Sequence, residues 1–276
     1  MSKYTQNNKN LMRLEAKENR KSKRATTQLH NVLESAELIL KENPHVTYER
    51  QHPIFSYIKI FTDLIQSKLV TNVIMNGRDN VYSKSYQFFN TVEAYMHPLD
   101  KIYLKEVVTR ANIYTKIGLN VSIQRDPIVT HLWNADRLAD ALRNIGSGVI
   151  INSFFKGGIQ RENKFEYDKL NHKGKYMYPL GVINVYNGNH SISAGLNKSE
   201  GNIIIDDLVD VSYLYDIYEF NGRYLINKET KEKEKIYFEF GALFEIGRLL
   251  LEHKEVFPEA VLDVINNKEP FKYSYM

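Results

Sequence analysis

The 276-residue sequence contains no cysteine. This absence excludes disulfide bonds, thiolate nucleophiles and cysteine-based zinc sites, and it is typical of a reducing compartment, so we expect a cytoplasmic protein. Long apolar runs are missing too. No run approaches the ~20 residues that span a bilayer, and the N-terminus is too polar for a signal peptide. The sequence therefore predicts no membrane partner.

Basic residues are concentrated at one end of the chain. Residues 1–24 contain eight Lys or Arg and two Glu, a net charge of +6, which leaves −2 for the rest of a chain whose total is +4. We expect residues 1–24 to form a basic, flexible head that can hold nucleic-acid phosphates by releasing counterions. The alternative is a solvated helix start with a frayed end.

The first half of the sequence has the apolar spacing of helices. Pro44 ends the first of them, and Asn76–Gly77 is expected to break the chain after the second. We interpret residues 25–118 as a helical subdomain. Its predicted helices span residues 26–43, 53–70, 83–95 and 100–118.

The pattern changes at residue 119, where short β-like runs begin. A helix over residues 134–145 is predicted from an Asn134 N-cap and from Leu138, Leu142 and Ile145 on one face. Asn221–Gly222 predicts a β-hairpin. The fold class is therefore α+β, with a mixed sheet and flanking helices in residues 119–276. Further strands are expected at residues 119–123, 148–152, 180–186, 202–206 and 209–220, a polar connection at 153–178, and helices at 240–253 and 258–266.

The strongest candidate site follows the apolar strand that precedes Asn187. Asn187–Gly188 is expected to form a tight turn, and Asn189 to cap a short helix beginning at His190. A strand, a glycine turn and a helix start leave free backbone N–H groups directed at one point, which suits a phosphate. The side chains of Asn187, Asn189, His190 and Ser191 are predicted to surround that point.

Residues 125–216 resemble the ParB/sulfiredoxin-like superfamily. The resemblance rests on an early arginine, Arg125, a helix, and a strand that leads to the box Gly188-Asn-His-Ser-Ile-Ser-Ala194. Members of this superfamily bind CTP or ATP phosphates at the box, and some cleave DNA or transfer phosphate. The resemblance implies a ParB-like core and adds Arg125 to the ligand-binding residues.

Two positions depart from the family pattern. Ser191 stands where the box usually has an arginine, so the main cation over the phosphates is missing, and a hydroxyl cannot replace its bidentate, permanently charged contacts. Arg125, or a cation from residues 153–178, is expected to compensate. Sulfiredoxin chemistry is excluded, because it needs a cysteine where Asn189 stands. The candidate cations in residues 153–178 are Lys156, Arg161 and Lys164.

His190 is the candidate catalytic residue. A histidine in a glycine turn can act as a general base, a phosphate donor or a metal ligand, or it can simply satisfy a nearby carbonyl. No metal site is predicted, since His172 lies 18 positions away in the sequence. The sequence does not identify a cofactor. A nucleotide with Mg²⁺ is one option, for which Asp206, Asp207 and Asp210 could supply carboxylate ligands. The alternative is that these acidic residues at a strand end are simply solvated.

The sequence therefore predicts binding of a nucleotide or nucleic-acid phosphate at the Gly188 turn, with phosphoester or nucleotide hydrolysis as a further capability. The alternative is a non-catalytic protein-interaction module on a degenerate ParB-like fold. A retained site should bring Arg125, Asn187, Asn189 and His190 to one polar cleft, whereas a degenerate scaffold should scatter them. The oligomeric state is not predicted.

Overall fold

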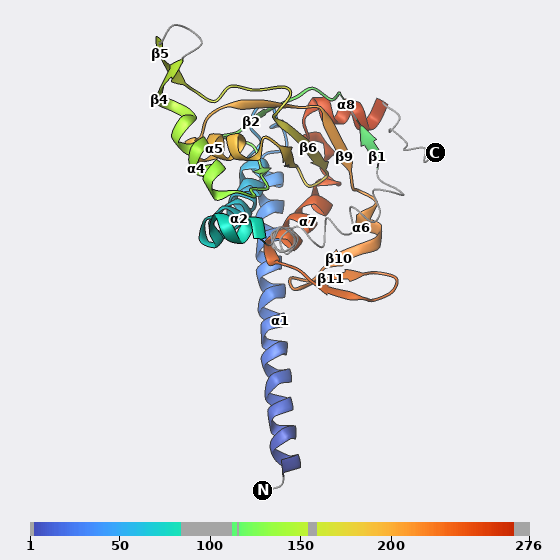
Figure 1. Ribbon diagram of the computed structural model, residues 1–276. Coiled ribbons are helices and arrows are strands. Elements are labelled where there is room, and N and C mark those ends of the chain that lie inside the picture. The colour runs from blue at the N-terminus through green and yellow to red at the C-terminus, as the bar shows by residue number, and fades with distance from the viewer. Residues whose placement is uncertain (1–2, 84–111, 115, 154–158, 268–276) are drawn as a thin grey trace, which may run out of the picture.

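A computed structural model describes residues 3–83, 112–114, 116–153 and 159–267 (Figure 1). The α+β class is confirmed: helices pack around a mixed five-stranded sheet, and smaller sheets lie at its margins. Within the described residues, no helix combines the length and the apolar character needed to cross a bilayer.

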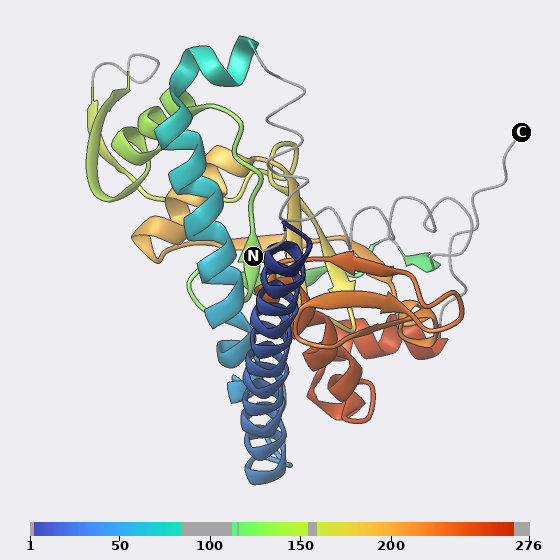
Figure 2. The ribbon, with the colours of Figure 1, turned by 90° about the horizontal axis from the view of Figure 1, so that it is seen from below.

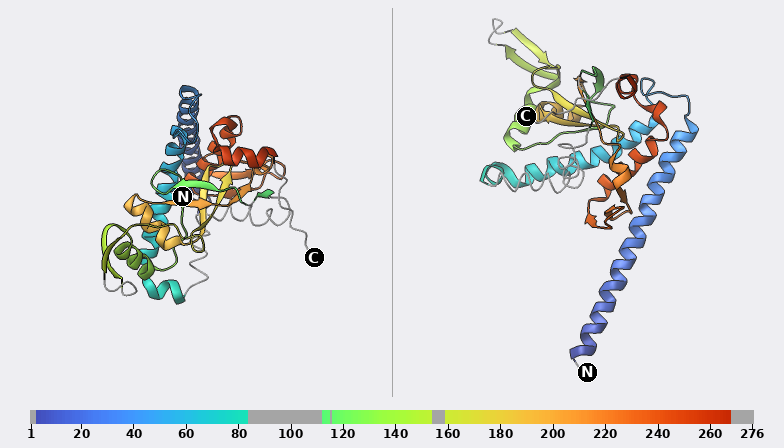
Figure 3. Two further views of the ribbon diagram at one scale, coloured as in Figure 1. Left: turned by 90° about the horizontal axis from the view of Figure 1, so that it is seen from above. Right: turned by 90° about the vertical axis from the view of Figure 1, so that its right-hand side faces the viewer.

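The basic head is part of a continuous helix, as in the alternative of a helix start. Helix α1 (Lys3–Glu42) includes the whole of residues 3–24, so the boundary expected at residue 24 lies inside it. Leu29, Ala36 and Leu40 are buried on the side that faces the body. The helical residues before Glu18 extend away from every other element (Figures 1 and 3). Helix propagation from the packed half extends order into the polar half, because adding a residue costs less than starting a helix.

Helix α2 (Pro53–Ser83) passes through Asn76–Gly77, where a break was expected. An interior glycine costs a helix about 1 kcal/mol, which packing of the preceding turns can offset. Those turns bury Ile54, Ile58 and Ile65. The helix predicted at residues 83–95 lies, apart from its first residue, outside the described residues.

The central sheet has the order β1-β9-β6-β7-β3. The β6–β7 and β1–β9 pairs are antiparallel, while β6–β9 and β3–β7 are parallel, with Ile128 opposite Ile183. A mixed sheet was expected. Its strands are β1 (Asn112–Tyr114), β3 (Ile128–Val129), β6 (Lys173–Tyr178), β7 (Val182–Asn187) and β9 (Asp207–Asp210).

Two of these strands overturn predictions. Residues 112–114 form β1 and not the end of a helix over 100–118, because they pair with β9. The connection predicted over residues 153–178 contains β6, where Gly174, Tyr176 and Tyr178 are buried alternately with half-buried residues. β6 lies between β7 and β9, and hydrogen bonds from both neighbours fix it as a strand.

The other strands form three small sheets. β2 (Leu119–Ser122) pairs with β8 (Asn202–Ile205), and β4 (Gly146–Ser153) pairs with β5 (Ile159–Asn163). The third sheet contains β10 (Tyr218–Phe220), β11 (Tyr224–Asn227) and β12 (Lys233–Lys235). The single strand predicted over 209–220 is wrong, since α6 (Leu214–Ile217) separates β9 from β10.

The hairpin predicted at Asn221–Gly222 joins β10 to β11 and presses against α1. A Cβ on Gly222 would lie 2.4 Å from the Ala25 carbonyl oxygen. Thr26 donates a hydrogen bond to the Asn221 carbonyl at 3.2 Å, and Arg223 forms an ion pair with Glu18. The hairpin therefore attaches α1 to the body between residues 18 and 26.

Helix α7 (Phe238–Leu250) packs against both α1 and α2 (Figure 2). Its Arg248 donates to Glu245 Oε2 at 2.6 Å and to the Tyr215 and Tyr218 carbonyls at 2.8 and 2.6 Å. A short 3₁₀ turn, η2 (Lys254–Val256), leads to α8 (Glu259–Asn267). Buried side chains of α1, α2, α7 and the central sheet belong to one core, to which residues 25–118 and 119–276 both contribute.

Helix α4 (Ala135–Asn144) confirms the predicted cap. The Asn134 side chain accepts a hydrogen bond from the Arg137 N–H at 3.0 Å. Leu138 is buried, whereas Leu142 and Ile145 are half-buried. α4 packs against α5 (Asn189–Lys198), so these two helices lie side by side near the ends of β3 and β7.

Candidate functional site

The candidate site begins where β7 passes into α5. Gly188 has φ +76° and is the N-cap residue of α5. Asn189 was predicted to be the cap, but it occupies the first turn and its Oδ1 accepts a hydrogen bond from the His131 N–H at 2.8 Å. Within the described residues, the N–H groups of Asn189, His190 and Ser191 have no hydrogen-bond partner. They supply the free donors that were expected at this turn.

Close packing against the two residues before β6 explains why position 188 is a glycine. A Cβ at Gly188 would lie 2.6 Å from His172 Cδ2 and 2.9 Å from the Asn171 carbonyl oxygen. In addition, any L-residue would pay a free-energy cost to adopt this left-handed backbone conformation, whereas glycine does not. Close packing against Asn171 and His172 therefore requires glycine whether or not a ligand binds.

The Ser191 hydroxyl is already engaged with protein groups. His172 Nδ1 accepts from the Asp168 N–H at 3.0 Å, so the proton of a neutral ring is on Nε2. His172 Nε2 then donates to Ser191 Oγ at 2.8 Å, and Ser191 Oγ donates to the Gly188 carbonyl at 3.0 Å. A histidine that donates to a serine does not act as its base. Ser191 therefore braces the turn, and it is neither a nucleophile nor a free phosphate ligand here.

His131 is a site residue that the sequence analysis missed. It follows β3, and its Nε2 lies 2.5 Å from Asn184 Oδ1 on the parallel strand β7. Because an amide oxygen accepts, the proton of the neutral ring is on Nε2, and the buried Nδ1 has no partner within the described part of the chain. Burial lowers the pKa of His131 more than the bond to Asn184 raises it. His131 is thus a neutral ring beside the start of α5.

His190 lies in the first turn of α5, beside the only tryptophan of the chain. Its ring meets the Trp133 ring edge to face, with centroids 5.2 Å apart. Burial lowers the pKa of His190, a hydrogen bond to the Asn134 backbone raises it, and the charge of Arg137 lowers it further, with a net decrease. The buried Nε2 has no partner within the described residues. His190 is therefore neutral near pH 7, with one buried, unpaired nitrogen.

Arg137 supplies a cation next to the start of α5. Its guanidinium carbon lies 4.5 Å from the centroid of the Trp133 ring, a cation–π contact. Arg137 is also close enough to lower the pKa of His190. The sequence analysis did not select it, because it is more than 50 positions from Ser191 in the chain.

Arg125 does not join this group. It precedes β3, at the amino end of the β3–β7 pair, whereas Gly188 follows the carboxyl end of β7. The six residues of β7 span about 20 Å. The Arg125 Nε donates to Asp126 Oδ1 at 3.0 Å, and the guanidinium packs over Tyr48 at 5.1 Å. The prediction that Arg125 meets the Gly188 turn is wrong.

The remaining predicted ligands also lie apart from one another. Asn187 is exposed at the end of β7. Lys164 pairs with Glu162 at 3.0 Å, and Arg161 is exposed on β5, while Lys156 lies outside the described residues.

Two of the three carboxylates named for Mg²⁺, Asp207 and Asp210, have protein partners. Asp207 accepts from the Tyr186 hydroxyl at 3.0 Å and Asp210 from the Ser212 N–H at 2.8 Å, at opposite ends of β9. Desolvation, followed by the charge of Asp207, raises the pKa of Tyr186 to about 12.

A separate pocket of about 400 Å³ lies between α2, α4 and α5. Leu138 and Leu142 line one side, while Gln66 and Ser193 contribute polar groups. Gln66 is held by two hydrogen bonds with Thr130, at 2.7 and 2.8 Å. The pocket follows the middle and far end of α5, so none of the predicted ligand residues around Gly188 lines it.

Comparison with known families matches residues 14–257 to a family described as Family of unknown function (DUF6710). The chain belongs to this family. No curated protein and no solved structure matches it. The matched residues include β7, α5 and most of α1, so the Gly188 turn and the basic helix are both features of a family member.

Proposed function

We propose that the protein binds a phosphate-bearing ligand, a nucleotide or a nucleic-acid phosphate, at the start of α5. The observation that carries the proposal is Arg137, whose guanidinium packs over Trp133, the ring that contacts His190 in the first turn of α5. Backbone donors at a helix start favour an anion, and a guanidinium adds charge-assisted hydrogen bonds. In this proposal Arg137 fulfils the role of the arginine that Ser191 replaces in the ParB-like box.

The order strand, glycine turn and helix start supports the ParB-like interpretation of this region. His190 gives the proposal a chemical extension. A neutral imidazole with an unpaired nitrogen is the form in which histidine acts as a general base. Attack of water on a bound phosphoester is therefore the reaction that this site would support.

Calorimetric titration against CTP, ATP and GTP, with and without Mg²⁺, tests the binding. One charge-assisted hydrogen bond contributes about 1.5–3 kcal/mol, so Arg137→Gln should weaken binding about tenfold or more. Arg143→Gln is the matched control, because Arg143 lies near the other end of α4 and pairs with Asp140. Equal losses in both variants would remove Arg137 from the site.

A phosphate-release assay tests the catalytic extension. His190→Gln should abolish release while nucleotide binding is retained, since glutamine keeps a polar side chain but is no base. Release at the parental rate by this variant would exclude His190 as the base.

The second candidate is a non-catalytic interaction module on a degenerate ParB-like fold. It is favoured by Arg125, which lies at the wrong end of the sheet, and by Ser191, whose hydroxyl is engaged with His172 and Gly188. If the folded parent protein binds none of the three nucleotides, this candidate replaces the first.

A further inference from the structure

The N-terminal part of α1 is held to the body at one place and then extends beyond it. The contacts of Glu18 with Arg223 and of Thr26 with Asn221 mark the attachment. The fifteen helical residues before Glu18 correspond to about 22 Å of helix. Figures 1 and 3 show no other element beside them. We call residues 3–24 of α1 the arm.

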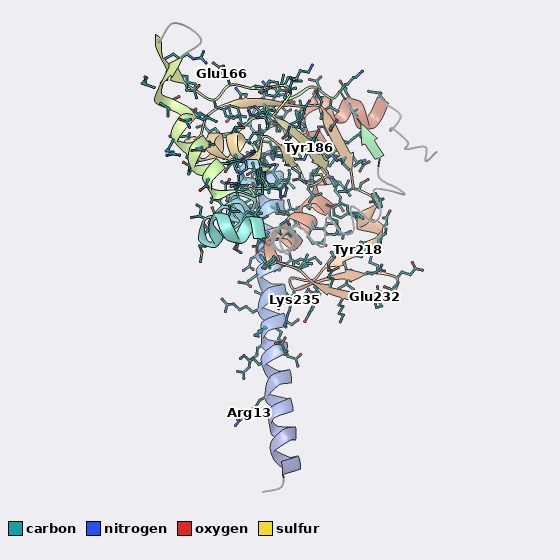
Figure 4. All side chains as sticks on the ribbon, in the orientation of Figure 1. Arg13, Glu166, Tyr186, Tyr218, Glu232 and Lys235 are labelled. Carbon is teal, nitrogen blue, oxygen red and sulfur yellow. The ribbon has the colours of Figure 1, made fainter. Side chains whose placement is uncertain are left out.

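The cations of the arm lie on one side of the helix. An α-helix turns by about 100° per residue, so the six exposed cations of residues 13–24 occupy an arc of about 160°. Glu18, which contacts the body, lies outside that arc. Figure 4 shows the Arg13 side chain directed away from the helix axis and the body. These six residues are Arg13, Lys17, Arg20, Lys21, Lys23 and Arg24.

Most of these cations have no acidic partner among the described side chains. Lys21 lies 3.3 Å from Glu18, and the other five form no ion pair with a described side chain. The charge is also segregated, since residues 1–24 carry +6 whereas the rest of the chain carries −2. A row of unpaired cations on an isolated helix is repulsive, and a polyanion relieves that repulsion.

We infer that the arm binds double-stranded DNA through the phosphates that flank the major groove. An α-helix with its side chains is about 10–12 Å wide, and the major groove of B-DNA is about 12 Å wide. Cations spread over about 160° reach both rims of such a groove. The major groove of duplex RNA is too narrow and deep for side chains to read.

An anionic membrane surface is the less favoured partner. Helices that lie on membranes combine a cationic face with large apolar residues that enter the lipid. Between residues 13 and 24 the apolar residues are Leu14 and Ala16 alone. Residues 13–24 of the arm therefore offer charge without a large apolar face.

The salt dependence of binding measures the number of phosphates that the arm contacts. Each neutralised phosphate contributes about −0.9 to the slope of log K against log salt, so the six cations of residues 13–24 account for a slope of about −5 at most. Arg13→Gln, Lys17→Gln and Arg20→Gln in one variant should make the slope shallower by about 2.7. Circular dichroism of the full chain confirms that the helix is retained.

The matched control removes the same charge from the body, through Lys169→Gln, Lys233→Gln and Lys235→Gln at three exposed positions. Fluorescence anisotropy with a 20-base-pair DNA duplex, between 50 and 200 mM salt, compares the three proteins. The parental slope in this control, together with a shallower slope in the arm variant, supports the inference. The inference is overturned if the arm variant and the body control have equal slopes, or if the parent does not bind DNA.

Two further probes decide the class of partner. A duplex RNA of the same sequence should bind at least tenfold more weakly than the DNA, and equal binding overturns the groove assignment. Vesicles that contain phosphatidylserine should sediment little protein. Sedimentation with these vesicles, without binding to DNA, identifies a membrane arm instead.

Discussion

Replacing Gly188 by alanine tests whether the turn before α5 depends on close packing. Gly188 has φ +76°, and a left-handed conformation costs an L-residue about 1–2 kcal/mol. The new Cβ would also lie 2.6 Å from His172 Cδ2, so His172 must move. The hydrogen bond from His172 to Ser191 would then be lost, at about 0.5–1.5 kcal/mol. The expected destabilisation is about 2–3 kcal/mol.

Gly118→Ala provides the matched control. Gly118 has φ +63°, and a Cβ there would meet no heavy atom within 4 Å. The Gly118→Ala variant should therefore lose only about 1–2 kcal/mol of unfolding free energy, which is the cost of the left-handed backbone. Urea unfolding followed by circular dichroism measures both variants. If Gly188→Ala costs no more than Gly118→Ala, the contact with His172 does not restrict the turn and the reasoning is refuted.

Three further changes test the core and the buried histidines. Arg248→Met should lower the free energy of unfolding by an amount at the lower end of about 3–5 kcal/mol, because it leaves the buried Glu245 carboxylate without its ion-pair partner while Arg248 is 30% exposed. Adding Glu245→Gln should recover part of this loss in urea unfolding. If the double variant recovers nothing, the pairing is contradicted. Leu138→Ala should lower the free energy of unfolding by about 2–5 kcal/mol, and Leu142→Ala by clearly less, because Leu138 is buried whereas Leu142 is half-buried. The reverse order in the same assay would contradict this difference in burial. Burial lowers the pKa of four histidines, including His131, so below about pH 6.5 the unfolded chain binds more protons than the folded chain. The free energy of unfolding should therefore fall as the pH is lowered from about 7 to about 5.5. Unchanged urea midpoints over that range would show that these rings are not neutral in the folded state.

Local chemistry was sufficient to predict the elements whose ends are fixed by nearby residues. The Asn134 cap and the Asn221–Gly222 turn both lie where the sequence placed them. β6 was missed because its buried residues are Gly174, Tyr176 and Tyr178, which do not form a strongly apolar pattern. Its strand conformation depends on β7 and β9, and no local residue specifies that pairing.

The candidate site was predicted in part for the same reason. Gly188 and the free N–H groups of α5 follow from one continuous stretch of sequence. His131 and Arg137 join that stretch only because β3 lies parallel to β7, with Ile128 opposite Ile183. Arg125 was misplaced because its separation from Gly188 depends on the direction of that pairing. The sequence alone does not specify whether β3 and β7 pair in parallel or antiparallel.

The packing of α1 against α7 has a consequence during synthesis. Leu29, Ala36 and Leu40 leave the ribosome early, but α7 begins at Phe238, almost 200 residues after the end of α1. At about 5–20 residues per second, the face of α1 that α7 covers stays without this partner for on the order of 10–40 s. α2 is translated sooner and can shelter part of that face. The nascent chain therefore presents a long amphipathic helix to chaperones until α7 is made.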